Sequence, residues 1–331
     1  MATGDEAIYE TVVFLDYFSD LPDPRQLIKV IYPLDEVLLL SLLAALAGAE
    51  TFSDIARFGE NKLDLLRRFR PFLNKTPTHG RLNEIFAAPD AERFQQCFVS
   101  WAAAHTGISA QVIAIDGKPS RRSFQKKGVD APIHIVSAFA ARQRLVLGQV
   151  KVTEKSNEIV AIPRLLDMLV IEGAIITIDA MWCQRDIARK IIDKKADYLL
   201  ALKGNQGTLR DDVELFAFEQ KDNDFRDTTI SQHKSIDGDH GRIETRLTTV
   251  LHDTVLHDID WLQKRHNWPG PKGIVTVESR RETGLKIATE IRFYITSATD
   301  PAEELAAVIR QHWAIENSLH WVMDRVFRDD E

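Results

Sequence analysis

Residues 112–118 read Val-Ile-Ala-Ile-Asp-Gly-Lys, an apolar run that ends in a carboxylate. Four consecutive apolar residues bounded by polar ones predict a short strand that is buried on both faces. A second run of this kind, residues 174–178, leads directly into Asp179. Both patterns place an acidic residue, Asp116 or Asp179, at the carboxyl end of a buried strand, where α/β sheets bind their ligands.

The segments around these two runs predict a larger sheet. Residues 133–140 and 144–152 predict a hairpin, and residues 198–202 predict a further strand. Helical patterns separate the later strands and cover residues 158–171, 184–195 and 206–218. Three strands followed by alternating helices and strands is the order of a ribonuclease H-like mixed sheet, with helices on both faces. In that order the strands that precede Asp116 and Asp179 are neighbours.

The regions before and after these segments have different sequence patterns. Short helical patterns predict a helical N-terminal domain over residues 1–106, and the α/β domain then covers residues 107–331. Within the second domain, residues 219–299 predict a β-rich insertion. Its expected strands are residues 245–251, 273–281 and 290–297.

A third acidic residue lies on a predicted helix that begins after Asp300 and Pro301. Apolar residues recur there at three- and four-residue steps, which predicts an amphipathic helix to about residue 326. Glu316 borders the apolar stripe, with His312 one turn before it and His320 one turn after it. A half-buried carboxylate is costly unless it is paired or binds a cation. The alternative is an ordinary surface glutamate.

The chain has 331 residues, of which 44% are hydrophobic and 27% are charged. This is the composition of a globular protein. The two cysteines, Cys97 and Cys183, lack CxxC spacing, so we expect neither a disulfide framework nor a cysteine zinc site. The longest apolar run, residues 37–47, is shorter than a membrane span, and the first residues do not resemble a signal peptide. We therefore expect a cytoplasmic protein without a membrane anchor.

The formal net charge of −7 argues against a protein that coats DNA only by neutralising phosphates. A local basic cluster nevertheless follows the first aspartate, and it contains Lys118, Arg121 and Arg122. Residues 117–128 include no acidic residue. This cluster predicts contacts to a DNA backbone, although a solvated basic loop is an equally good interpretation.

The three carboxylates together predict metal chemistry. Two adjacent strand-end aspartates repel each other unless a cation lies between them. Oxygen ligands with open positions suit Mg²⁺ or Mn²⁺ better than Zn²⁺. With Glu316 as a third ligand, Asp116 and Asp179 would hold two ions about 3.5–4 Å apart, an arrangement used for phosphoryl transfer. One strand-end aspartate alone is more often a helix cap, so the combination carries the prediction.

Seven strings in the chain resemble the H-repeat-associated group of bacterial insertion-sequence transposases, over a match that runs from about residue 18 to the last residue. They are IAIDGK (113–118), IHIVSAFA (133–140), EKSNEIVAIPRLLD (154–167), TIDAM (177–181), DYLLALKGNQ (197–206), HGRIETR (240–246) and HWAIENSLHW (312–321). The resemblance implies a DDE transposase whose catalytic triad is Asp116, Asp179 and Glu316. It also implies that the N-terminal helices are the transposase-associated domain, that the element's terminal repeats and target DNA are partners, and that a homodimer bridges two DNA ends.

Further DNA contacts are hypotheses. Lys203 and Asn205 belong to a motif of the group, although a strand-to-helix turn would need glycine and asparagine there anyway. Many DDE transposases carry Tyr, Arg and Lys around the glutamate, a pattern that this chain lacks. Arg310 and His312 are expected to substitute as phosphate contacts.

Some features favour other interpretations. Trp182 stands where the group normally has glycine, Pro119 and Ser120 replace a polar-aliphatic pair, and the group normally continues past a terminus like this one. These departures raise the alternative of a truncated or decayed, inactive DNA-binding remnant. A metal nuclease of the same fold, which cuts but does not join, is another alternative. A zinc site formed by His312, Glu316 and His320 is the least favoured, because no fourth ligand is evident.

Overall fold

The computed structural model describes residues 13–106, 112–120, 133–152, 158–226, 228–239, 242–252, 259–284, 286–321 and 323. The chain divides into two compact units, Met1–Thr106 and Gly107–Glu331. Within the described residues, no helix is long and apolar enough to cross a membrane.

The first unit is helical, as the sequence predicts. Its elements are η1 (Leu27–Lys29), α2 (Leu34–Leu46), α3 (Phe52–Asn61), α4 (Leu63–Leu66), α5 (His79–Phe86) and α6 (Ala91–Thr106). The apolar run of α2 supplies the centre of its core, where Leu39 and Leu40 are fully buried. Thr51 begins α3 with a capping box, in which its hydroxyl accepts the N–H of Asp54 at 3.1 Å. Local sequence signals therefore account for most of this unit.

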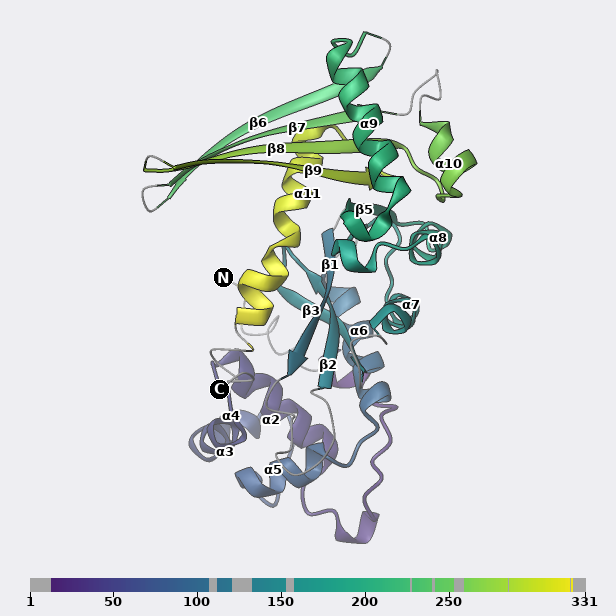
Figure 1. Cartoon of the computed structure of the whole chain (residues 1–331). Helices are drawn as coiled ribbons and strands as arrows, with labels where there is room; N and C mark the ends of the chain where they lie inside the picture. The colour runs from purple at the N-terminus through teal and green to yellow at the C-terminus, as the bar shows by residue number, and fades with distance from the viewer. Residues whose placement is uncertain are drawn as a thin grey trace, which may run out of the picture. The chain divides into compact units, whose positions relative to one another are not determined.

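The second unit is built on one nine-stranded mixed sheet (Figure 1). The strands are β1 (Val112–Ser120), β2 (Ile133–Ala140), β3 (Leu145–Val152), β4 (Ile175–Ile178), β5 (Asp197–Leu202), β6 (Thr229–Asp239), β7 (Arg242–His252), β8 (Gly273–Thr283) and β9 (Lys286–Thr296). Their order in the sheet is β3-β2-β1-β4-β5-β9-β8-β7-β6. The first five strands follow the order expected for a ribonuclease H-like sheet, and β1 is antiparallel to β2 and parallel to β4. The predicted fold class is confirmed.

Helices and short turns connect these strands. They are α7 (Glu158–Met168), η4 (Ala180–Trp182), α8 (Arg185–Asp193), η5 (Gly204–Gln206), α9 (Thr208–Asp222), α10 (Asp260–His266), α11 (Ala302–His312) and a π-helix, η6 (Ile315–His320). Helices α9 and α11 lie on opposite sides of the β6–β9 strands (Figure 1). Helix α11 also packs against β1 and β4, so it connects the insertion strands with the first half of the sheet.

The expectation that the first strand ends at Asp116 is wrong. Strand β1 continues to Ser120, because β2 pairs with it as far as Ser120 and Ile133. The parallel partner, β4, stops earlier, at the pair Ile115 and Ile178. Asp116 therefore lies inside a strand but at the end of its parallel pairing.

The insertion has four strands instead of the three expected. Strand β6 was not predicted, because its sequence, TISQHKSIDGD, has few apolar residues. It is nevertheless paired with β7 along its whole length. The insertion does not form a separate sheet, since β9 pairs antiparallel with β5, for example at Leu199 and Thr296.

The last helix also differs from the prediction. A regular helix was expected to continue past Glu316, but α11 ends at His312 and Glu316 lies in the π-helix η6. Single π turns insert an extra residue per turn and are frequent at functional sites. The π turn shifts Glu316 from the face that α-helical spacing would give it.

Candidate active site

The sheet register brings Asp116 and Asp179 side by side. Ile115 and Ile178 are parallel partners, so the next residue of each chain segment leaves the paired region at the same edge. One oxygen of Asp116 accepts the N–H of Gly117 at 2.8 Å, and one oxygen of Asp179 accepts the N–H of Ala180 at 2.7 Å. Both side chains are half-buried.

The π-helix brings Glu316 to this edge. His320, from the same π-helix, has its Nδ1 3.6 Å from Oδ2 of Asp116. The Lys118 ammonium, which is buried, donates to the main-chain oxygen of His320 at 3.0 Å and so holds the π-helix against β1. The side chain of Glu316 reaches solvent, yet desolvation raises its pKa, the negative charge of Asp179 raises it further, and Lys203 opposes the shift. The carboxylates of Glu316 and Asp179 therefore interact.

Asp179 and Glu316 line one cavity of about 550 Å³. Lys203 lines it too, and its ammonium lies 3.0 Å from Oδ1 of Asp179. The donor set is oxygen-only at the end of two adjacent strands, which fits a hard divalent cation. As these side chains are placed, however, no three His, Cys, Asp or Glu residues in the described part of the chain are gathered closely enough to hold an ion. The donor chemistry fits a divalent ion, but a closed ligand cage is not formed.

The turn after β5 supports the turn that follows Asp179. The Asn205 side-chain amide donates to the oxygen of Ala180 at 3.0 Å. The Gln206 amide donates to the same oxygen at 2.9 Å and to the oxygen of Cys183 at 3.1 Å. Turn η5 thereby holds η4, whose first residue follows Asp179.

His312 lies in the wall of the same cavity. Its Nδ1 is 2.9 Å from the hydroxyl of Thr177 in β4. Burial lowers the pKa of His312 to about 4; the charge of Asp179 raises this pKa and that of Lys203 lowers it. The imidazole is therefore neutral at neutral pH, so any contact it makes with a phosphate is a hydrogen bond without a full charge.

Residues 108–330 match the family described as Transposase DDE domain, and residues 15–102 match the one described as DDE_Tnp_1-associated. The chain belongs to the DDE transposase family.

Two of the relatives in sequence agree with this assignment. The H repeat-associated putative transposase YhhI of Escherichia coli (strain K12) is 41% identical over 323 residues, which cover 96% of this chain and 83% of that protein. The putative transposase YncI of Escherichia coli O157:H7 is 41% identical over 328 residues, which cover 96% and 80% of the two chains. A solved structure, the piggyBac transposase synaptic complex with hairpin DNA, aligns with 96% of this chain and 66% of that one, at 9% identity and a TM-score of 0.37.

The other candidates for DNA contacts are spread over the transposase. Arg310 points toward the insertion and pairs with Asp237 of β6. Arg121 and Arg122 lie outside the described residues. Trp182 is buried in η4 and is not among the residues that line the cavity of Asp179.

Sequence reasoning missed the contributions of α9 and of the insertion strand β9 to this site. Arg210 of α9 and Glu290, Arg292 and Tyr294 of β9 line the same cavity as Asp179. The available signal was the two-residue spacing of Glu290, Arg292 and Tyr294, which places the three side chains on one face of a strand.

Proposed function

We propose that this chain is a transposase that cleaves DNA at the ends of an insertion sequence and transfers the freed strands to target DNA. Asp116, Asp179 and Glu316 are its catalytic carboxylates. The observation that carries this proposal is the parallel pair of Ile115 and Ile178, which sets the two aspartates next to each other where the π-helix presents Glu316.

The same three carboxylates are the proposed ligands of two Mg²⁺ or Mn²⁺ ions. When bound, such ions supply activation of the attacking oxygen and stabilisation of the leaving oxygen. The chain itself orients these ligands, since Gly117 and Ala180 N–H groups and the η5 turn fix the two aspartates. Lys203 lies beside Asp179, where its ammonium would contact a DNA phosphate.

Further features of the proposal follow from the family. Water and then the 3′-hydroxyl of the cut strand serve as nucleophiles, without a covalent enzyme intermediate. The DNA partners are the terminal repeats and the target, a homodimer holds two DNA ends, and the reaction takes place in the cytoplasm. Lys118, Arg121, Arg122, Asn205, Arg310 and His312 complete the proposed DNA-contact set.

The test is a cleavage and joining assay with the full chain. A supercoiled plasmid that carries both ends of the element is incubated with Mg²⁺ or Mn²⁺, and cut and joined products are separated on gels. We expect both products, and we expect Asp179→Asn to lower their rate by at least about 10³-fold while DNA affinity persists. Asp193→Asn, an exposed carboxylate on α8, is the matched control.

The three outcomes separate the candidate functions. Cut and joined products support the transposase. Cut products without joining would point to a nuclease of the same fold. DNA binding without metal-dependent cutting would point to an inactive remnant, unless Trp182→Gly restores cutting, in which case the catalytic carboxylates are intact.

A further inference from the structure

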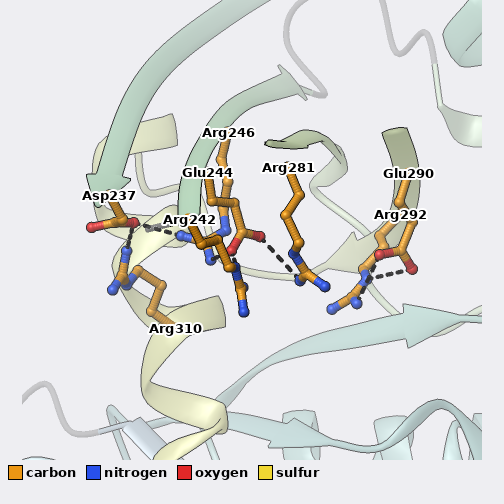
Figure 2. Close-up of polar contacts among 8 residues, drawn as sticks. All are labelled: Asp237, Arg242, Glu244, Arg246, Arg281, Glu290, Arg292 and Arg310. Atoms are coloured by element: carbon orange, nitrogen blue, oxygen red, sulfur yellow. Dashed lines mark hydrogen bonds and ion pairs between the residues drawn. The ribbon is translucent and has the colours of Figure 1, made fainter. Parts of the chain in front are cut away.

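A second cavity, of about 360 Å³, lies on the face of β6–β9 that is turned toward α11. Five arginines line it: Arg242 and Arg246 of β7, Arg281 of β8, Arg292 of β9 and Arg310 of α11. We call this cavity the arginine groove. Figure 2 shows its charged side chains in one row that crosses the insertion strands beside α11.

Strand alternation explains why these arginines share one face. Arg242, Glu244 and Arg246 are spaced by two residues on β7, so their side chains point to the same side of the sheet. Residues at the alternate positions of β7, such as Leu247, point to the other side and line a cavity together with residues of α9. On β8, Arg281 lines the groove while its neighbour Arg280 pairs with Glu282 outside it.

The arginine groove adjoins the cavity that Asp179 and Glu316 line. Four residues line both cavities, and these are Arg292, Tyr294, Ile309 and Trp313. Asn317, next to Glu316 in the chain, also lines the groove. The two cavities therefore lie side by side, and a polymer longer than the first cavity would reach the second.

Acidic residues hold the guanidinium groups in place but do not balance them. Glu244 is buried and lies 2.9 Å from Arg246 and 3.5 Å from Arg281, with Arg242 as a third partner. Asp237 pairs with Arg246 and Arg310. Five guanidinium groups thus face three carboxylates, once the pair of Arg292 and Glu290 is included.

All three carboxylates are ionised near neutral pH. Burial alone would raise the pKa of Glu244, but the hydrogen bond from Arg242 and the charges of Arg246 and Arg281 lower it overall. Hydrogen bonds from Arg310 and Arg292 lower the pKa of Asp237 and Glu290, respectively. The groove consequently keeps an excess of two positive charges in a chain whose net charge is −7.

We propose that the arginine groove binds the sugar–phosphate backbone of the DNA strand whose reacting phosphodiester lies among Asp116, Asp179 and Glu316. This inference rests on the proposed function. Guanidinium groups match phosphate oxygens with paired N–H donors, and a guanidinium already oriented by a carboxylate loses less freedom on binding. The arginines are spaced along a row, which suits a ligand with repeated phosphates better than a single small anion.

The test compares two adjacent arginines on opposite faces of β8. Arg281→Gln removes a groove arginine, and Glu244 keeps its two closer partners. Arg280→Gln removes the same charge from the other face. Binding of the full chain to a labelled DNA duplex of about 40 base pairs and random sequence is measured without divalent ions at several salt concentrations.

We expect Arg281→Gln to weaken binding about three- to tenfold and to reduce the slope of log affinity against log salt by about one. Arg280→Gln should change the affinity less than about twofold. Equal effects of the two substitutions, or no effect of either, would overturn the proposal. The thermal unfolding curve of each variant shows whether the variant is folded.

A second measurement does not depend on removing an arginine. A photoreactive p-benzoylphenylalanine replaces Ser279, which lines the groove, or Arg280, which does not. If the duplex crosslinks to position 279 and not to position 280, the result supports DNA binding in the groove. Equal crosslinking from both positions contradicts it. The proposed function is judged separately by Asp179→Asn, which is expected to lose cleavage and retain binding. Normal groove binding together with unimpaired cleavage by Asp179→Asn would therefore refute the proposed catalytic site and leave the proposal for the groove intact.

Discussion

Glu36 buries a carboxyl group in the N-terminal helical unit, where one of its oxygens accepts the N–H of Phe72 at 2.7 Å. Desolvation raises the pKa of this carboxyl, and the hydrogen bond from Phe72 opposes the shift. A pKa that is raised in the folded state makes the protonated form of Glu36 the more favourable one for folding. Its contribution to stability is fully present below the ordinary value of 4.5 and is lost as the pH rises through the folded pKa.

Glu36→Gln should therefore become more stable than the wild type as the pH rises. Glutamine keeps an acceptor for Phe72 and cannot ionise. The difference in unfolding free energy should grow as the pH rises above about 4.5 and level off above the folded pKa, with a slope of at most about 1.4 kcal/mol per pH unit. Thermal or denaturant unfolding of both proteins at matched pH values measures it. A difference that stays constant or shrinks would contradict the assignment.

At the scale of elements, the turn η5 determines the position of the turn that follows Asp179. The Gln206 side chain makes two of the bonds that join them, to the oxygens of Ala180 and Cys183. Its own oxygen accepts the N–H of Lys203 at 3.1 Å, which also orients the lysine beside Asp179. Gln206 is thus a positioning residue in the proposed reaction.

Gln206→Ala should lower stability by about 1–3 kcal/mol, because the buried Cys183 carbonyl loses its bond. It should also lower the rate of strand cleavage by about 10–100-fold through displacement of Asp179, with DNA affinity changed little. Gln263→Ala, at an exposed position of α10, is the control. A stable variant with normal cleavage would show that η5 does not position the aspartate.

At the scale of the whole α/β unit, the insertion and the first five strands form one sheet. Thr296, at the end of β9, is fully buried. Its hydroxyl donates to the oxygen of Tyr198 in β5 at 2.7 Å and accepts the N–H of Ala298 at 3.0 Å. The adjacent Ser297 hydroxyl accepts the Tyr198 N–H at 2.9 Å. These bonds join the insertion to the strand beside the one that leads to Asp179.

Thr296→Val should destabilise the unit by about 1–3 kcal/mol, since it leaves the N–H of Ala298 without its acceptor and removes one of the two donors to the Tyr198 oxygen. Because the sheet is continuous, the loss should affect both halves. Hydrogen exchange of β5 and β8 amides should accelerate together, whereas the exposed Thr289→Val on β9 should leave both unchanged. Acceleration confined to β6–β9 would show that the insertion unfolds independently.

Much of the fold follows from local sequence. Apolar runs identify β1 and β4 because both strands are buried on two faces, and the helical unit follows from periodicity and capping. The same runs pick out Asp116 and Asp179, since each acid directly follows a run. Strand β6 is not predicted from the sequence, because its pairing with β7, rather than its own apolar content, makes it a strand.

Local sequence patterns suffice to predict the ribonuclease H-like order of elements and the three candidate acids, because buried strands precede Asp116 and Asp179 and an apolar helical stripe borders Glu316. Tertiary structure alone decided the π turn at Glu316, the bond from Lys118 to His320 and the arginine groove. Each of these depends on which face of an element meets a partner far away in the chain. Sheet register and helix packing create those meetings, and no local pattern encodes them.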